Sequence, residues 1–355
     1  MRILVATDAW RPQVNGVVKT YERLGTEVQA FGAELIFLSP SDFGSVPCPT
    51  YPQIRLAVPD QARANAFIDA VRPDAIHIAT EGPVGWMARR YCRRHNRVFT
   101  TSFHTRFAEY VASRSVIPES WIYAVLRRFH ARSAGVMVAT ESLSQDLAAR
   151  GFTRLLPWTR GVDTDHFRPR PIRRFGEGPV FLYVGRVAVE KNIEAFLSLD
   201  LPGRKVVVGD GPHLAYLQRR FADVTFTGEC SGDDLATCYS SADVFVFPSR
   251  TDTFGMVILE AMASGLPVAA FPVTGPRDLV VPGVSGSLSE DLRAAALSAM
   301  TLSAEDARAR ALGFNWEHAA RLFVMHVRNA LGADVVTEAR ELARIRASRP
   351  AHFSG

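Results

Sequence analysis

The sequence predicts an α/β protein with two Rossmann-like domains, each built on a parallel sheet. Short runs of β-branched residues alternate with amphipathic stretches along the whole chain, a pattern typical of strands joined by covering helices. The 355 residues, 47% of them apolar, suffice for two domains of ordinary size. The segment 157–171, PWTRGVDTDHFRPRP, carries three prolines and little periodicity. We interpret it as the crossing between the domains.

Ten segments are expected to form strands, five in each half of the chain. In the first half they are Arg2–Thr7, Glu34–Ser39, Ala75–Ala79, Val98–Ser102 and Gly135–Ala139. In the second half they are Val180–Val184, Lys205–Val208, Val224–Thr227, Val244–Phe247 and Val268–Phe271. We therefore expect a first domain over residues 1–167 and a second over 168–331. The tail 332–355 is expected to complete the first domain as a last helix.

Composition narrows the class of protein. No apolar run reaches the ~18 residues of a membrane span, and the N-terminus MRILVATDAW resembles a strand rather than a signal peptide, so we expect a cytoplasmic protein. The four cysteines form no CxxC pair and are expected to be reduced thiols. Residues 1–170 hold 22 Arg/Lys against 15 Asp/Glu (+7), whereas residues 171–355 hold 19 against 21 (−2). The first half is therefore expected to meet an anionic surface.

The stretch 248–267, PSRTDTFGMVILEAMASGLP, combines a turn with a helix start and two carboxylates. Asp252 precedes the turn Thr253-Phe254-Gly255, and Glu260 lies about two helical turns further on. Free amides at a helix N-terminus favour anions, whereas carboxylates accept hydrogen bonds from hydroxyls. The combination suits a nucleotide sugar. The alternative is an ordinary βα unit with a capping Asp and a surface Glu.

Further loops after predicted strands carry glycines and cations. Gly185-Arg186 follows one strand and Lys191 opens the next helix, so both side chains could converge on one phosphate. Gly209-Asp210-Gly211 and Thr227-Gly228-Glu229 follow two more strands. In the first half, Asn15-Gly16 follows the first strand, and His104 lies at the carboxyl end of the fourth, where α/β sheets bind ligands.

Two stretches of the first half mix arginines with aromatic residues. They are WMARRYCRRHNRV (86–98) and WIYAVLRRFHAR (121–132). Such helices bind anionic membrane surfaces, although an ordinary helix with a solvated arginine face fits equally well. The residues expected at a membrane or acceptor surface are Arg89, Arg90, Arg93, Arg94, Trp121, Arg127 and Arg128. No nucleic-acid recognition module is found.

Taken together, these motifs resemble the retaining glycosyltransferases of family 4, which have the GT-B fold of two facing Rossmann-like domains. The resemblance covers nearly the whole chain. It rests on Asn15-Gly16-Val17, His104, Gly161-Val162-Asp163, Gly185-Arg186, Glu190-Lys191-Asn192, Gly209-Asp210-Gly211, the pair Asp252 and Glu260 with the following AMASGLPV, and Phe314-Asn315-Trp316-Glu317. The last motif resembles the start of the family's closing helix, which crosses back to the first domain. Asp252 stands where the family often has Glu.

The resemblance implies a role for each matching residue. Arg186 and Lys191 would neutralise the donor diphosphate, Glu260 would hold the ribose, and His104 would contact the transferred sugar. Asp252 would position the sugar with the amides of Thr253, Phe254 and Gly255, and Gly16 would let the first domain close over the diphosphate. Gly185 and Gly209 are also expected among the donor-binding residues. The base would lie near Gly228 and Glu229. Neither a protein nucleophile nor a metal is implied, and Asp163-Thr164-Asp165, although formally DxD, lies away from the donor loops.

The acceptor and the base stay open at this stage. The basic first half favours a membrane lipid, and the chain is similar to bacterial lipid glycosyltransferases of this family. We expect transfer from UDP-glucose or UDP-glucuronate to diacylglycerol at the inner face of the cytoplasmic membrane, with GDP-mannose as the main competing donor. Two alternative hypotheses are an epimerase that acts on the nucleotide sugar alone and a non-catalytic protein that binds nucleotide sugars.

Overall fold

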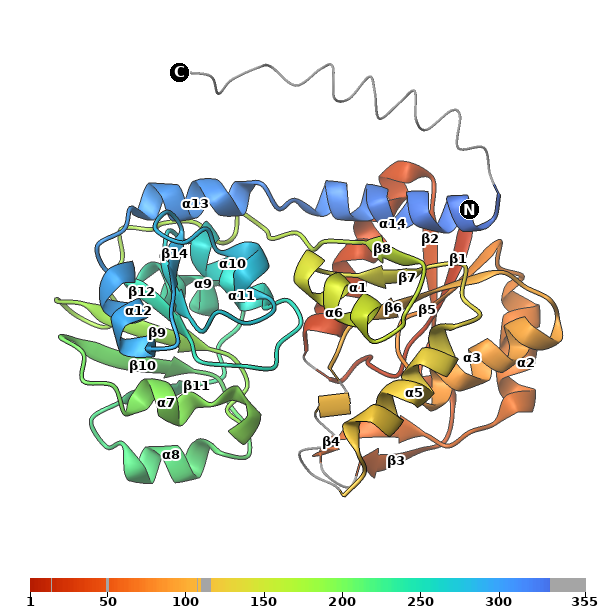
Figure 1. The fold of residues 1–355 in the computed structure, drawn as a ribbon, viewed down its shortest axis with the longest axis horizontal. Helices are drawn as coiled ribbons and strands as arrows, with labels where there is room; N and C mark the ends of the chain where they lie inside the picture. Colours follow the sequence, from red (N-terminus) through yellow and green to blue (C-terminus); the bar gives the residue numbers. More distant parts are fainter. Residues whose placement is uncertain (14, 49–50, 107, 110–115, 333–355) are drawn as a thin grey trace, which may run out of the picture.

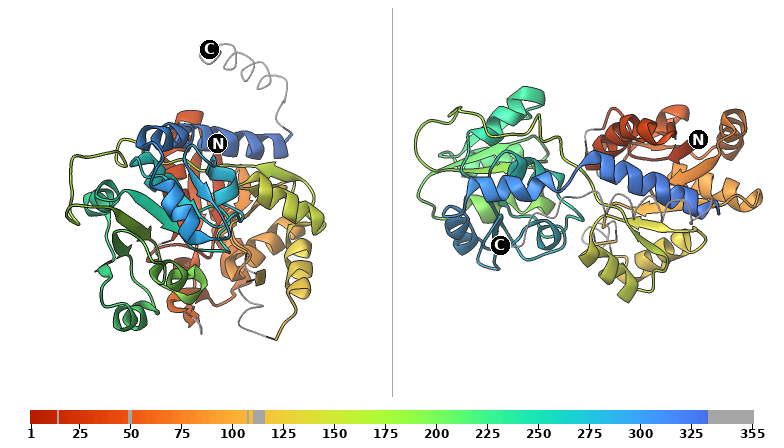
Figure 2. Two further views of the ribbon diagram at one scale, coloured as in Figure 1. Left: turned by 60° about the vertical axis from the view of Figure 1, so that its left-hand side comes forward. Right: turned by 90° about the horizontal axis from the view of Figure 1, so that it is seen from above.

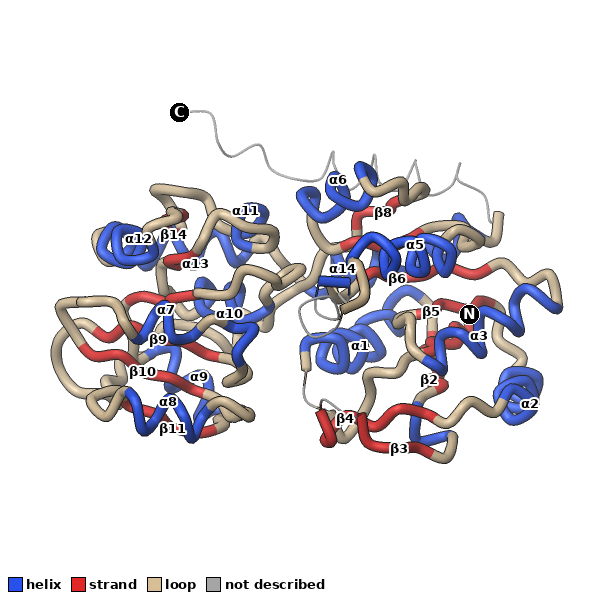
Figure 3. Tube along the Cα trace, turned by 60° about the horizontal axis from the view of Figure 1, so that its bottom comes forward, coloured by secondary structure: helices blue, strands red, loops and turns tan. Residues whose placement is uncertain are grey.

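The computed structural model describes residues 1–13, 15–48, 51–106, 108–109 and 116–332. Two domains lie side by side, each containing a six-stranded parallel sheet with helices on both faces (Figures 1 and 3). The predicted α/β class with two Rossmann-like domains is confirmed. The further predicted helix over 332–355 lies outside the described residues.

The first sheet has the strand order β2-β1-β5-β6-β7-β8. Its strands are β1 (Arg2–Ala6), β2 (Glu34–Leu38), β5 (Ala75–Ile78), β6 (Phe99–Phe103), β7 (Val136–Val138) and β8 (Leu155–Pro157). Its helices are α1 (Gly16–Glu27), α2 (Gln61–Val71), α3 (Pro83–Arg94), α5 (Glu119–His130) and α6 (Glu141–Ala149), with short 3-10 turns η1 (Val28–Phe31) and η2 (Pro40–Asp42). Alternate residues of β1 enter opposite cores: Leu4 packs with α3, and Ile3 packs with α1.

The second sheet has the order β11-β10-β9-β12-β13-β14. Its strands are β9 (Val180–Val184), β10 (Arg204–Val208), β11 (Thr225–Gly228), β12 (Val244–Phe247), β13 (Val268–Ala270) and β14 (Gly286–Leu288). Its other elements are η3 (Val189–Lys191), α7 (Ile193–Leu197), α8 (Leu214–Arg220), α9 (Gly232–Ser240), α10 (Met256–Ala263), α11 (Pro276–Leu279), α12 (Leu292–Ala299) and α13 (Ala304–Leu312). The chain ends, as described, with α14 (Trp316–Ala330).

All ten predicted strands are present, and the structure contains four further strands that were not predicted. β8 and β14 extend the two sheets and have three residues each, too short for a periodic pattern. β3 (Ser45–Cys48) and β4 (Tyr51–Ala57) form a small antiparallel hairpin outside the main sheets. Both hairpin strands contain a proline, which lowers the expectation of a strand.

The position of α14 corrects the expected domain boundary at residue 331. Ala320, Phe323 and Val327 of α14 pack into the core under β1 and α1, and the helix lies along the first domain (Figure 2). The chain therefore crosses back between α13 and α14, near Gly313, and α14 belongs to the first domain. The periodicity of α14 shows only that it has one apolar face. It does not show which sheet that face covers.

The outgoing and returning crossings pack against each other. Val162 donates its amide hydrogen to the carbonyl of Phe314 at 3.0 Å. A Cβ on Gly161 would lie 2.3 Å from the backbone nitrogen of Trp316, closer than any real contact. Only glycine fits at this point, which explains physically why Gly161 precedes Val162 in the crossing.

Candidate active site

The loops that carry the predicted site residues face each other across the domain interface. In parallel sheets, loops after neighbouring strands gather at the carboxyl edge. β1 and β6 belong to the first sheet, and β9, β10 and β12 are neighbours in the second. Thr253 of the second domain donates its hydroxyl hydrogen to the carbonyl of His104 at 2.6 Å. A Cβ on Gly16 would lie 3.9 Å from Cγ of Met256.

Two helix N-termini therefore meet at this interface. α1 begins at Gly16, where Asn15 accepts hydrogen bonds from the amides of Val17 and Val18. α10 begins at Met256, after Gly255 in a left-handed conformation with φ 88°. Both helix dipoles direct positive potential into the same space, which suits an anion. The sequence predicted an anion site at the N-terminus of α10; in the structure the N-terminus of α1 lies beside it.

Lys191 and Asp252 form the most direct polar contact of the predicted donor site. Lys191 Nζ donates a hydrogen bond to Asp252 Oδ1 at 2.6 Å. Burial alone would raise the pKa of Asp252, but the charge and hydrogen bond of Lys191 hold it below its usual value. Asp252 Oδ2 is buried and has no hydrogen bond of good geometry in the described part of the chain, although the Ser249 hydroxyl lies close enough to help lower the pKa of Asp252. This oxygen is an acceptor that a ligand hydroxyl could satisfy.

Arg186 lies half-buried in the loop after β9, opposite η3, which ends at Lys191. The hydroxyl of Tyr183 donates to the carbonyl of Arg186 at 3.0 Å and holds this loop against the strand. Asp252 also lies near Tyr183, because its charge, after burial, contributes to raising the pKa of that phenol. The structure therefore pairs Lys191 with Asp252 and places the loop of Arg186 near them through Tyr183.

The glycine loops of the second domain pack too closely for side chains. A Cβ on Gly209 would lie 1.9 Å from the carbonyl oxygen of Gly185, and Gly209 has a φ of 140°. Gly209 in turn donates its amide hydrogen to the carbonyl of Gly228 at 2.7 Å. A Cβ on Gly228 would meet nothing within 4 Å, and Glu229 beside it is exposed. The space beside Gly228, where the nucleotide base of the donor is expected, is therefore open.

Glu260 is buried in α10, with 5% of its surface exposed. The hydroxyl of Tyr239, on α9, donates to Glu260 Oε2 at 2.9 Å. Burial and the Glu260 charge raise the pKa of Tyr239 well above its usual value, so the phenol stays a donor. Sequence reasoning missed Tyr239, because a tyrosine within an apolar helix face resembles an ordinary core residue. Phe254 also lies in the core, so only its backbone is available to a ligand.

His104 has a different environment from the one expected. Its Nε2 lies 3.0 Å from the hydroxyl of Tyr21, and its Nδ1 accepts a hydrogen bond from Arg160 at 3.0 Å. Burial, together with the charge of Arg160, lowers the pKa of His104 well below its usual value. Both ring nitrogens already have protein partners, so in this structure the His104 imidazole has no nitrogen available to a sugar.

A buried polar network continues behind His104. The hydroxyl of Tyr21 lies 2.9 Å from Nε2 of His77, whose Nδ1 lies 2.8 Å from the Thr100 hydroxyl. The Ser102 hydroxyl lies 3.0 Å from the same Nε2. Burial lowers the pKa of His77 to about 3, which keeps its ring neutral. Sequence reasoning missed Tyr21, His77 and Arg160. Arg160 could have been noticed, since it directly precedes the Gly161-Val162-Asp163 motif.

The arginine surface contains one wrong prediction. Only 5% of Arg89 is exposed, and it donates hydrogen bonds at 2.8 Å to the carbonyls of Phe129 and Arg128, which end α5. Arg89 therefore caps a helix rather than facing solvent. By contrast, Arg90, Arg93 and Arg94 are exposed on α3, and no acidic side chain pairs with them within the described residues.

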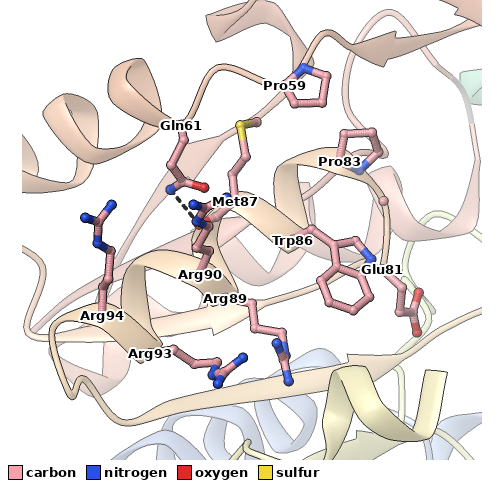
Figure 4. Close-up of a pocket in the computed structure, with 11 residues that line it drawn as sticks. Pro59, Gln61, Glu81, Pro83, Trp86, Met87, Arg89, Arg90, Arg93 and Arg94 are labelled. Atoms are coloured by element: carbon pink, nitrogen blue, oxygen red, sulfur yellow. Dashed lines mark hydrogen bonds between the residues drawn. The ribbon is translucent and has the colours of Figure 1, made fainter. Parts of the chain in front are cut away.

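α3 lines a groove of about 900 Å³ (Figure 4). Its lining includes the arginines Arg89, Arg90, Arg93 and Arg94 together with Trp86 and Glu81. The start of α3 is not available to an anion, because the buried Asp8 carboxylate accepts the amide hydrogens of Val84 and Gly85. Any anion in this groove would have to meet the arginines.

The remaining predicted surface residues lie on α5. Trp121 is 71% exposed, and Arg127 and Arg128 are exposed at the other end of the helix. Arg127 also donates to the carbonyl of Arg150 at 3.0 Å. In the crossing, Asp163 accepts a hydrogen bond from the amide of His166 at 3.0 Å. No cluster of metal-ligating side chains is found in the described ranges.

Two models of known protein families match the chain. Residues 14–166 match the model described as Glycosyltransferase Family 4, and residues 178–304 match Glycosyl transferases group 1. A GDP-mannose-dependent alpha-mannosyltransferase of Mycolicibacterium smegmatis is 31% identical over 81% of this chain and 84% of its own length. An alpha-monoglucosyldiacylglycerol synthase of Streptococcus pneumoniae is 27% identical over 84% of this chain and 78% of its own.

The sulfoquinovosyl transferase SQD2 of Arabidopsis thaliana is 33% identical over 74% of this chain, which spans about half (54%) of that relative. Among solved structures, a sucrose-phosphate synthase of Thermosynechococcus elongatus superposes with a TM-score of 0.73 at 20% identity, covering 94% of this chain and 99% of its own. The Anabaena protein Alr3699/HepE, solved with UDP-glucose, superposes with a TM-score of 0.71 at 15% identity, covering 93% and 100%. Both similarities establish the fold.

The two facing domains and the loops between them define a GT-B sugar transferase. The extent of the match to the mannosyltransferase then settles the family: the chain belongs to glycosyltransferase family 4. The predicted GT-B fold and the predicted family are both confirmed.

Proposed function

We propose that this protein transfers a hexose from a nucleotide sugar to a membrane lipid, with retention of the anomeric configuration. The favoured reaction joins glucose or glucuronate from its UDP donor to diacylglycerol at the inner face of the cytoplasmic membrane. The observation that carries the donor side is the Lys191–Asp252 pair at 2.6 Å, beside the starts of α1 and α10. It combines positive charge for a diphosphate with a carboxylate for sugar hydroxyls.

In the proposed step, the bond between the anomeric carbon and the diphosphate oxygen breaks while the acceptor oxygen attacks from the same face. Arg186 and Lys191 stabilise the charge that develops on the leaving diphosphate. The acceptor proton passes to an oxygen of that diphosphate, so no protein nucleophile is needed. Asp252 Oδ2 accepts a sugar hydroxyl, and Glu260, oriented by Tyr239, accepts the ribose hydroxyls. The two cations supply the charge, and the proposal requires no metal.

The lipid side of the proposal is supported by α5 and the segment before it. Ile117, Trp121 and Val125 follow one another at helical spacing and are 46%, 71% and 53% exposed. Large apolar side chains in such a row are unfavourable in water and favourable at a lipid interface. Arg127 and Arg128 follow on the same helix and could attract anionic headgroups. No helix within the described ranges is long and apolar enough to cross a bilayer.

A liposome assay tests the reaction. Vesicles containing diacylglycerol are incubated with the full chain and with radiolabelled UDP-glucose, UDP-glucuronate or GDP-mannose in turn. We expect label in the lipid fraction from a UDP sugar. Release of labelled sugar without an acceptor, or its transfer only to a soluble acceptor, would contradict the proposal of a lipid acceptor. An Arg186→Ala variant with normal turnover would refute the diphosphate assignment and favour a different donor site.

Membrane contact is tested separately by vesicle sedimentation. A Trp121→Ser, Val125→Ser double variant should bind vesicles containing phosphatidylglycerol about tenfold more weakly, since two buried apolar side chains are lost. Tyr216→Ser, which removes an exposed aromatic ring from the second domain, is the matched control and should bind normally. Equal binding of all three proteins would place the membrane contact elsewhere.

Transfer of mannose from GDP-mannose is the second candidate. It is favoured by the 31% identity to the mannosyltransferase over 84% of that relative. The open space around Gly228 does not discriminate between the bases. A calorimetric titration with UDP and with GDP distinguishes the candidates, because only the correct base should bind tightly without its sugar.

A further inference from the structure

Arg160 occupies an unusual position for an arginine. It lies in the outgoing crossing, 4% exposed, and no carboxylate pairs with it anywhere in the described residues. A buried cation without an acidic partner is unfavourable unless other groups compensate it. Its guanidinium donates to the carbonyls of Trp158 (2.8 Å) and Thr159 (3.1 Å) and lies 3.9 Å over the Trp158 ring. The guanidinium also donates to Nδ1 of His104 at 3.0 Å.

This contact determines the tautomer of His104. A guanidinium has only donors, so Nδ1 of His104 must accept, and a neutral ring then carries its hydrogen on Nε2. Nε2 therefore donates to the hydroxyl oxygen of Tyr21 at 3.0 Å. The opposite tautomer would place two hydrogens between Arg160 and Nδ1 and is excluded by repulsion.

The donor and acceptor roles of the next hydrogen bonds, from Tyr21 to His77 and Thr100, depend on this tautomer. With its oxygen accepting from His104, the Tyr21 hydroxyl can donate its own hydrogen to Nε2 of His77, 2.9 Å away, or to the Ser102 hydroxyl, 3.4 Å away. If it donates to His77, the hydrogen of His77 lies on Nδ1 and is donated to the Thr100 hydroxyl at 2.8 Å. Arg160 thus fixes the direction of the hydrogen bond between His104 and Tyr21.

His104 also links these hydrogen bonds to the second domain. Its carbonyl accepts the hydroxyl hydrogen of Thr253 at 2.6 Å, and Thr253 adjoins Asp252, the partner of Lys191. This bond uses the backbone carbonyl of His104, so the ring affects it only through the His104 backbone, which the contacts of the ring with Tyr21 and Arg160 help to hold in place. Arg160 itself is buried, and its two terminal nitrogens already donate to Trp158, Thr159 and His104.

We propose that Arg160 is a positioning residue for sugar transfer. It holds His104 in the Nε2–H tautomer, and through His104 it keeps the first domain aligned with Thr253 of the donor element. This role rests on the proposed transferase reaction, but the state of the His104 ring does not, and it can be measured without any substrate.

Histidine NMR provides that measurement. The chain has nine histidines, and a His104→Asn variant identifies the signal of His104 in long-range ¹H–¹⁵N spectra. The wild type should show the Nε2–H tautomer, without titration, between pH 5.5 and 8. Arg160→Met keeps an apolar side chain of similar length against Trp158. It should let the Nδ1–H tautomer of His104 appear, because Nδ1 loses its donor, and it should raise the pKa of His104, although burial still holds that pKa below its ordinary value. Arg160→Lys should restore the wild-type spectrum, and Arg154→Met, an exposed arginine near β8, should not change it.

Activity supplies the second readout, with the same variants and the donor that supports transfer. Arg160→Met should lower kcat at pH 8 about tenfold through misalignment, and the loss should grow as the pH is lowered because the pKa of His104 is higher than in the wild type. Arg160→Lys should recover most of the loss and the wild-type pH profile. A wild-type tautomer and pH profile in Arg160→Met, with only the melting temperature lowered, would show that Arg160 merely stabilises the fold. A wild type with the Nδ1–H tautomer would also overturn the proposal. Absence of transfer by every protein would contradict the proposed function and leave the NMR result to decide the assignment of His104.

Discussion

Acidification should destabilise the first domain through His77. The His77 ring is fully buried, with hydrogen-bond partners Tyr21, Ser102 and Thr100, and burial lowers its pKa to about 3. In the unfolded chain a histidine has a pKa of about 6.5. Between these values the unfolded chain binds a proton that the folded chain excludes, so stability falls as the pH is lowered through 6.5.

The magnitude follows from the gap between the two pKa values. Each pH unit below 6.5 removes about 1.4 kcal/mol, as long as the pH stays above the folded pKa. At pH 4.5 the gap is two units, so His77 should lower the free energy of unfolding by about 3 kcal/mol relative to pH 7. For a domain of ordinary stability this is a large fraction of the total.

Tryptophan fluorescence in urea is a suitable assay. All five tryptophans lie in the first domain or on α14, which packs on it, so the signal reports the unfolding of that domain. The free energy of unfolding is measured at pH 7 and pH 4.5 for the wild type and for His77→Gln, whose amide can still donate and accept. Carboxylates and the other histidines titrate equally in both proteins. We expect the wild type to lose about 3 kcal/mol more than the variant.

The control is His95→Gln, because His95 is exposed at the end of α3. That variant should show the same pH dependence as the wild type. If His77→Gln does so as well, His77 is not held neutral in the folded protein, and the network described behind His104 has the wrong protonation.

Three further predictions concern the donor side. Lys191→Met leaves the carboxylate of Asp252 without its cation. The rate of sugar transfer should fall on the order of 10²–10³-fold. The pKa of Asp252 should rise, so the acid limb of the kcat/KM profile should move to higher pH. Tyr239→Phe removes the hydrogen bond to Glu260 and should weaken nucleoside diphosphate binding about fivefold in calorimetry; unchanged binding would place the ribose elsewhere. Gly209→Ala puts a Cβ 1.9 Å from a backbone carbonyl at a positive φ, and urea unfolding should show a loss on the order of 3 kcal/mol, whereas full stability would mean that the loop packs less closely.

Much of the donor side could be predicted from the sequence because its determinants are local. Asp252, Gly255 and Glu260 belong to one turn and one helix, and a helix N-terminus attracts anions whatever surrounds it. The glycines after β9, β10 and β11 likewise mark the carboxyl edge of a sheet that hydrophobic alternation already indicates. At these positions, local sequence patterns were enough to predict the donor-side loops.

Arg89 shows where local reasoning stops. Four arginines of α3 look alike in the sequence, and their number correctly indicated a basic surface at Arg90, Arg93 and Arg94. Only the packing of α3 against α5 decides that Arg89 points inward to cap the carbonyls of Phe129 and Arg128. A helix presents its residues every 100° or so around its axis, and the sequence does not say which neighbour each direction meets.

The sequence by itself thus determined two parallel sheets, the loops at their carboxyl edges and the family to which the chain belongs. The resemblance also indicated that the last helix returns to the first domain, and the tertiary structure showed which core residues of α14 pack there. Only the tertiary structure decided that His104 is held between Tyr21 and Arg160, which lie 83 and 56 residues from it along the chain. Periodicity and turn chemistry act over a few residues, whereas such contacts form only when separate strands and crossings are packed together.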